Sequence, residues 1–162
     1  MRIAALLIVA LGCSAVSAQI GERDPFAAKR PQAVTLAAPV VATVPAGKPA
    51  NVEMHFRVQS GLHINSHAPR ENVLIPTAIT LVPTLGVKVL GWEYPQGTEY
   101  ALAVEPNNKL NVYTGEFSVR LRLKIAEAGT QMIPATLRYQ ACDSNQCMPP
   151  RNLPFTLELT AK

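Results

Sequence analysis

The chain has 162 residues and a formal net charge of +4. This length suits one domain that buries a hydrophobic core without help from crosslinks. The densest basic group, Arg120, Arg122 and Lys124, alternates with apolar residues, which predicts the solvent face of a strand and not a nucleic-acid or membrane patch. The sequence contains no P-loop, dinucleotide fingerprint, Ser-His-Asp spacing or paired-carboxylate site, so it offers no support for those enzyme classes.

Residues 1–18 are predicted to be a secretory signal peptide. Arg2 precedes a short apolar run, Ile3 to Leu11, and small residues lead to a cleavage site after Ala18. The run is too short for a membrane span, and no second apolar stretch follows it. Lipidation of Cys13 is an alternative, but the preceding residues form a poor lipobox. Such a signal would export the domain to an oxidising compartment, and its cleavage would remove Cys13.

Residues 19–32 are polar and patternless, which predicts a flexible segment before a domain at 33–162. Two segments alternate between apolar and polar residues as half-buried strands do, NVEMHFRV at 51–58 and EFSVRLRLKI at 116–125. Turns rich in proline, glycine and asparagine separate shorter candidate strands at 33–38, 77–83, 87–94, 135–141 and 154–161. No segment has a helical period. About seven strands predict an all-β, immunoglobulin-like sandwich of two antiparallel sheets.

Cys142 and Cys147 are the two cysteines that would remain after cleavage. They lie between the strands at 135–141 and 154–161, which predicts a hairpin-like connection with Asp143 as a turn former. An even pair suits a disulfide in an oxidising compartment. A span that folds back can bring the two Cα atoms within the roughly 4.4–6.8 Å that a disulfide requires. The spacing makes a bridge feasible but does not establish one.

Two roles are open for such a bridge. A loop this small removes only about 2 kcal/mol of chain entropy from the unfolded state, and a domain of this size has little need of it. Loop-borne bridges are often exposed and labile to exchange. The spacing alone therefore leaves a structural staple and a redox-active pair equally open.

A copper site is a third hypothesis, because histidines, cysteines and a methionine supply its ligand types. His63 and His67 are four residues apart, but they straddle a strand end and a turn, and His55 is on a strand. No histidine follows Cys147, although blue-copper domains place one there. We therefore expect no metal and no cofactor, and we expect His63 to pack beside the cysteine loop as a turn residue.

The run YQACDSNQCMPP, residues 139–150, resembles the active-site segment of the N-terminal periplasmic domain of the thiol:disulfide interchange protein DsbD. That segment has an aromatic strand residue, here Tyr139, then Gln, a small residue and two cysteines around a short polar turn. One residue, here Met148, and a pair of prolines, Pro149 and Pro150, follow. Weaker similarities in the same order lie at 58–69, 74–81, 93–97 and 111–123, so the resemblance covers about residues 33–160.

The resemblance implies an immunoglobulin-like fold with a reversible disulfide between Cys142 and Cys147. In the family, this domain takes electrons from a membrane partner and passes them to periplasmic thioredoxin-fold proteins. Carried over by position, Cys147 forms the mixed disulfide and Cys142 resolves it. The implied function is periplasmic thiol–disulfide interchange of the protein-disulfide reductase type. A non-catalytic interaction module with a structural disulfide remains the alternative, and a copper-binding sandwich is the weaker one.

Several residues around the cysteines are candidate site residues. Pro149 and Pro150 would hold the chain extended after Cys147. Asp143 would raise the pKa of a neighbouring thiol only if it pointed inward. Four residues separate the cysteines, where the best-known members have five. The segment 98–111 lacks their acidic-aromatic cap loop, so its Tyr100 is only a candidate lid. The sequence has neither a membrane conduit nor a thioredoxin-like domain, and we expect its electron donor to be another protein.

Overall fold

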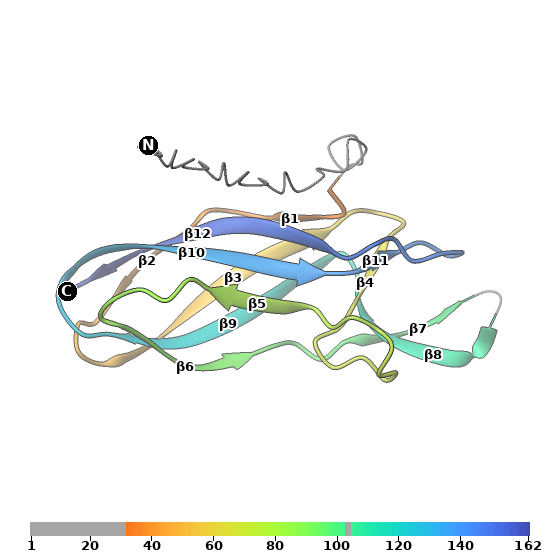
Figure 1. Cartoon of the computed structure of the whole chain (residues 1–162), viewed down its shortest axis with the longest axis horizontal. Helices are drawn as coiled ribbons and strands as arrows, with labels where there is room; N and C mark the ends of the chain where they lie inside the picture. Colours follow the sequence, from red (N-terminus) through yellow and green to blue (C-terminus); the bar gives the residue numbers. More distant parts are fainter. Residues whose placement is uncertain (1–31, 103–104) are drawn as a thin grey trace, which may run out of the picture. The chain divides into compact units, whose positions relative to one another are not determined.

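The computed structural model describes residues 32–102 and 105–162, and every regular element in these ranges is a strand (Figure 1). The predicted signal peptide and nearly all of the predicted segment 19–32 lie outside them. No helix in the described ranges is long and apolar enough to cross a membrane. The described strands are β1 (Val34–Leu36), β2 (Val40–Val44), β3 (Pro49–Val58), β4 (His63–Asn65), β5 (Ala78–Leu81), β6 (Val87–Glu93), β7 (Thr98–Leu102), β8 (Glu105–Tyr113), β9 (Glu116–Ile125), β10 (Gly129–Tyr139), β11 (Ala141–Cys142) and β12 (Arg151–Ala161).

The described strands form three four-stranded sheets. The first has the order β1-β3-β9-β6, the second β2-β12-β10-β5 and the third β11-β4-β8-β7. Neighbouring strands are antiparallel, except that β2 runs parallel to β12. Figure 1 shows β10 and β12 extending along β3 and β9, with β4, β7, β8 and β11 towards one end. The first two sheets confirm the predicted all-β, immunoglobulin-like sandwich, and the sequence did not indicate the third sheet.

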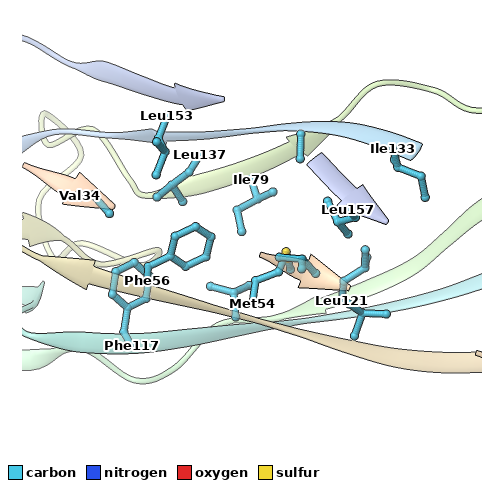
Figure 2. Packing of buried hydrophobic residues seen from close by; sticks show 14 of the residues in the cluster. Val34, Met54, Phe56, Ile79, Phe117, Leu121, Ile133, Leu137, Leu153 and Leu157 are labelled. Carbon is cyan, nitrogen blue, oxygen red and sulfur yellow. The ribbon is translucent and has the colours of Figure 1, made fainter. Parts of the chain in front are cut away.

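The hydrophobic core fills the space between the first two sheets. On β3 the apolar positions of the predicted alternation are buried and the polar ones exposed, and β9 repeats the pattern. Phe56 stacks on Phe117 with ring centroids 5.3 Å apart and meets Phe155 edge-on at 5.6 Å. Figure 2 shows side chains of the two sheets facing one another, with Met54, Phe56, Phe117 and Leu121 opposite Ile79, Ile133, Leu137, Leu153 and Leu157. Burial of these apolar faces stabilises the sandwich.

Candidate functional site

The cysteines lie in the connection that joins β10 to β12, at the closed end of this hairpin. These two strands pair along their whole length, from Gly129 opposite Ala161 to Tyr139 opposite Arg151. The chain then continues into the short strand β11 and returns, and Cys142 pairs with Cys147 in one further antiparallel bridge. The predicted hairpin-like connection is therefore confirmed.

Cys142 and Cys147 are joined by a disulfide, and their Cα atoms are 3.9 Å apart. Backbone hydrogen bonds on either side of the pair join residues 141 and 148 (2.8 Å) and residues 143 and 146 (3.0 Å). The cysteines therefore form a non-hydrogen-bonded pair, which is the position where opposing antiparallel residues approach most closely. This pairing favours a short Cα separation, and the observed 3.9 Å lies below the range that the sequence analysis used.

Cys142 and Cys147 differ in their exposure to solvent. Cys142 is 1% exposed, whereas Cys147 lies in the exposed turn. The difference arises because β11 pairs with β4 in the third sheet, while none of the described strands pairs with the outer side of the returning segment. A thiolate of another protein can therefore reach Cys147 more readily than Cys142.

Strand β4 places His63 beside Cys142. The two residues are partners in the β4–β11 ladder, so their side chains project to the same side of the sheet. His63 is 1% exposed, and among the described residues its Nε2 atom has no hydrogen-bond partner. The ring of Tyr100, on β7, lies on the imidazole with a centroid separation of 4.1 Å. The fold thus brings together three candidate residues that are up to 79 positions apart, His63, Tyr100 and Cys142. His63 is a strand residue and not the turn residue that the sequence predicted, because β4 begins at this position.

Asp143 begins the turn between the cysteines. Its Oδ1 accepts hydrogen bonds from the backbone N–H groups of Asn145 (2.7 Å) and Gln146 (2.8 Å). These two bonds, helped by nearby His63, lower the pKa of the Asp143 carboxyl. Burial lowers the pKa of His63, and the Asp143 carboxylate opposes part of that shift. The partly exposed carboxylate of Asp143 and the buried imidazole of His63 are therefore close enough to interact, beside Cys142.

Because burial lowers the pKa of His63, we expect the folded protein to lose stability in acid. Unfolded His63 would have its ordinary pKa, about 6.5, whereas burial lowers the pKa in the folded state. The unfolded state therefore binds more protons once the pH falls below about 6.5, and the free energy of unfolding should decrease until the pH is below the folded pKa. Urea unfolding at several pH values between about 7 and 5 measures this decrease.

His63→Gln should flatten that part of the pH profile. His55→Gln is the matched control, because His55 is exposed on the outer face of β3. An unchanged slope in His63→Gln would contradict the assignment of the acid loss to this imidazole.

A buried amide network fastens the cysteine loop to β4. The Nδ2 group of Asn65 donates to Gln140 Oε1 at 3.2 Å and to the Ile75 carbonyl at 3.0 Å. Gln140 Nε2 in turn donates to the carbonyl of Met148 at 3.3 Å, next to Cys147. Neither Asn65 nor Gln140 was among the residues predicted from the sequence. Both lie in segments that resemble the family, and Gln140 is two residues before Cys142, which was the available signal.

Asn65→Ala should lower the free energy of unfolding of the oxidised protein by about 1–3 kcal/mol, because it leaves two partly buried acceptors, the Ile75 carbonyl and Gln140 Oε1, without this donor. Asn65 is 0% exposed, so water cannot replace the lost amide without rearrangement. Urea unfolding measures the change. Exposed Asn51→Ala is the control and should change stability by no more than about 0.5 kcal/mol. A loss for Asn65→Ala as small as that of the control would contradict the network's role.

The other candidate residues occupy different surroundings. Tyr139 is buried in the core, and its burial raises the pKa of the phenol. Met148 is partly buried and packs against the core, whereas Pro149 and Pro150 are exposed. Sequence reasoning placed all four near the disulfide because they are its neighbours along the chain. Only the two prolines lie on the surface beside Cys147.

The three histidines do not converge. His55 lies on the outer face of β3, 4.0 Å from the Glu53 carboxylate. His67 stacks on Tyr94 at 3.7 Å, and its Nδ1 is 2.9 Å from the carbonyl oxygen of Thr77. In the described part of the chain, no three His, Cys, Asp or Glu side chains are grouped as metal ligands. The ligand types required for copper are therefore present in the sequence but dispersed in the fold.

A groove of about 540 Å³ borders the site. His63 and Tyr100 form part of its wall, and segments 57–62 and 114–116 form the rest. The ion pair between Arg57 and Glu116 closes one part of this wall, with Arg57 Nε 3.0 Å from Glu116 Oε1. The groove offers a contact surface beside His63, which is the ladder partner of Cys142.

Comparison with known proteins identifies similar molecules. A family model described as "Thiol:disulfide interchange protein DsbD, N-terminal" matches residues 29–159. No curated protein matches the chain. Among solved structures, the N-terminal periplasmic domain of ScsB from Proteus mirabilis is 14% identical, with a TM-score of 0.50 over 76% of this chain and 44% of that chain. The reduced N-terminal domain of Neisseria meningitidis DsbD is 19% identical, with a TM-score of 0.47 over 72% of this chain and 82% of that chain.

Proposed function

The chain belongs to the family of DsbD N-terminal thiol:disulfide interchange domains, and on that premise we propose that it carries electrons between periplasmic proteins through the Cys142–Cys147 disulfide. The observation that carries this proposal is the contrast between an exposed Cys147 and a buried Cys142 in one disulfide. Exchange needs one sulfur that a partner can reach and a second that is held ready to displace the partner.

In the reduced protein, the Cys147 thiolate attacks one sulfur of a partner disulfide. The partner's S–S bond breaks, its other sulfur leaves as a thiolate, and a mixed disulfide joins the two proteins. Cys142 then loses its proton and attacks Cys147 Sγ, which releases the partner's remaining sulfur as a thiolate. Two electrons pass to the partner, and this chain ends with the Cys142–Cys147 disulfide. The same steps in reverse let a reduced donor reload the pair.

The proposed partners are periplasmic thioredoxin-fold proteins as electron acceptors and a membrane protein as electron donor. The Neisseria meningitidis DsbD N-terminal domain forms a complex with the PilB N-terminal domain, which supports docking of another domain on a member of this family. The predicted signal peptide supports the periplasmic location. The groove beside His63 and Tyr100 provides surface for such a contact, because His63 is the ladder partner of Cys142.

A transfer assay between purified proteins tests the proposal. The reduced chain is mixed with one oxidised thioredoxin-fold domain of protein disulfide isomerase, whose potential of about −180 mV makes transfer from this chain favourable. The reaction is quenched in acid, and free thiols are alkylated and counted by intact mass. We expect two alkyl groups to be lost from this chain and gained by the acceptor domain. The variant with both cysteines replaced by serine is the control and should transfer nothing. If both proteins kept their starting redox states, the disulfide would be a structural staple in an interaction module.

A further inference from the structure

The imidazole of His63 has surroundings that the exchange scheme above does not use. His63 and Cys142 are ladder partners on β4 and β11, and both are 1% exposed. Side chains at opposing ladder positions have Cβ atoms about 4.5–5.5 Å apart and lie on the same face of the sheet. The imidazole is therefore a buried neighbour of the less accessible sulfur of the pair.

One nitrogen of this ring has no partner in the oxidised protein. Among the described residues, none donates to or accepts from His63 Nε2. A buried polar atom without a partner is costly and calls for an explanation. A disulfide has no proton to donate, but reduction gives Cys142 an S–H group on the same face of the sheet as the imidazole. The redox reaction itself would thus supply the missing hydrogen-bond donor.

We propose that His63 is the general base that takes the proton from Cys142 when this sulfur resolves the mixed disulfide, and the acid that returns it when the pair is reduced. This inference rests on the proposed function. In the resolving step, the Cys142 S–H proton moves to Nε2 while the sulfur forms a bond to Cys147 Sγ. The bond between Cys147 and the partner breaks, the partner leaves as a thiolate, and the imidazolium later releases its proton to solvent.

The chemistry of a buried thiol makes such a base necessary. Only the thiolate is nucleophilic, and a thiol in an apolar environment ionises less readily than one in water. Exposed Cys147 can lose its proton to solvent, but Cys142 cannot do so easily. Burial lowers the pKa of His63, so the ring is neutral near pH 7 and able to accept a proton. The most effective base has a pKa near the working pH, and the Asp143 carboxylate opposes part of the lowering of the His63 pKa.

The groups around the ring favour this role. The Asp143 carboxylate, at the start of the turn, attracts the imidazolium that forms after proton transfer. Tyr100 covers one face of the ring from β7, and the ring is 1% exposed. Arg57 and Glu116, which line the groove beside His63, are paired with each other and so contribute little net charge. Asp143 is the one unbalanced charge that the described residues place against the imidazole.

The test separates the two chemical steps of a single turnover. The reduced protein is mixed with a partner disulfide, and the mixed disulfide is followed by acid quenching and mass. In His63→Gln, formation through exposed Cys147 should keep its rate, but resolution at pH 7 should slow about 100-fold, so the mixed disulfide should accumulate. The defect should shrink towards pH 9, where the thiol ionises without help. His55→Gln is the matched control and should behave as the unchanged protein.

The unchanged protein provides a second measurement that does not depend on how a variant folds. Its resolution rate should rise with pH through a group that titrates below about 6.5, as a buried histidine does, and level off before pH 8. A rate that rises only near pH 8.5, or a His63→Gln variant that resolves at the unchanged rate, would overturn the role of His63. Neither result would affect the proposed function, whereas a protein that forms no mixed disulfide at all would refute both.

Discussion

Cys142→Ser should turn the protein into a covalent trap for its partners. The exposed Cys147 would still attack a partner disulfide, but serine cannot displace the partner, so the mixed disulfide would persist. A thioredoxin that keeps only its exposed cysteine, activated by a chromogenic thiol, measures this result. We expect nearly complete conversion to a conjugate that disappears on reduction.

Cys147→Ser is the matched control for this trap. It leaves only the Cys142 thiol, which is 1% exposed on the strand paired with β4. Conjugate formation should fall at least about tenfold, because a buried thiol is a poor nucleophile. Equal trapping by the two variants would contradict the assignment of Cys147 as the partner-facing sulfur.

Phe56→Ala should cause the largest loss of stability among single substitutions in the sandwich. Phe56 is 0% exposed and lies between the rings of Phe117 and Phe155, which belong to opposite sheets. Truncation removes the buried ring and leaves a cavity that joins both sheets, at a cost of about 3–5 kcal/mol in the free energy of unfolding. Urea unfolding of the oxidised protein measures it.

Val41→Ala is the control for the core substitution, because this side chain is 65% exposed on β2. Its effect should stay within about 0.5 kcal/mol. If Phe56→Ala lowered the free energy of unfolding by less than about 1 kcal/mol, the two sheets could not be packed around this ring as described.

The strands that the sequence predicts well are those with one buried face. In β3 and β9, every second residue enters the core, and this produces the alternation that identifies them. Strand β4 has no such pattern because all three of its residues are buried. Strand β7 has no fully buried residue, so it has no apolar face to alternate with a polar one. The third sheet, which holds β4 and β7, was therefore missed.

The same limit applies to the candidate site. The hairpin around the cysteines follows from turn residues between two strands, which are local features. The burial of Cys142 and the position of His63 depend on the pairing of β11 with β4, and the residues joined by that ladder are 79 positions apart. No local pattern encodes a contact between such distant segments, so only the resemblance pointed to these residues together. The Asn65–Gln140 hydrogen bond was missed for the same reason.

The reduction potential of the Cys142–Cys147 disulfide distinguishes an electron carrier from a protein with a structural staple. The purified domain is equilibrated in glutathione buffers of different ratios, and its thiols are alkylated and counted by mass. An exchangeable pair predicts a midpoint of about −200 to −250 mV, within reach of other thiol–disulfide proteins. A pair that stays oxidised in millimolar reduced glutathione, with a potential below about −300 mV, would show a structural staple and contradict the account.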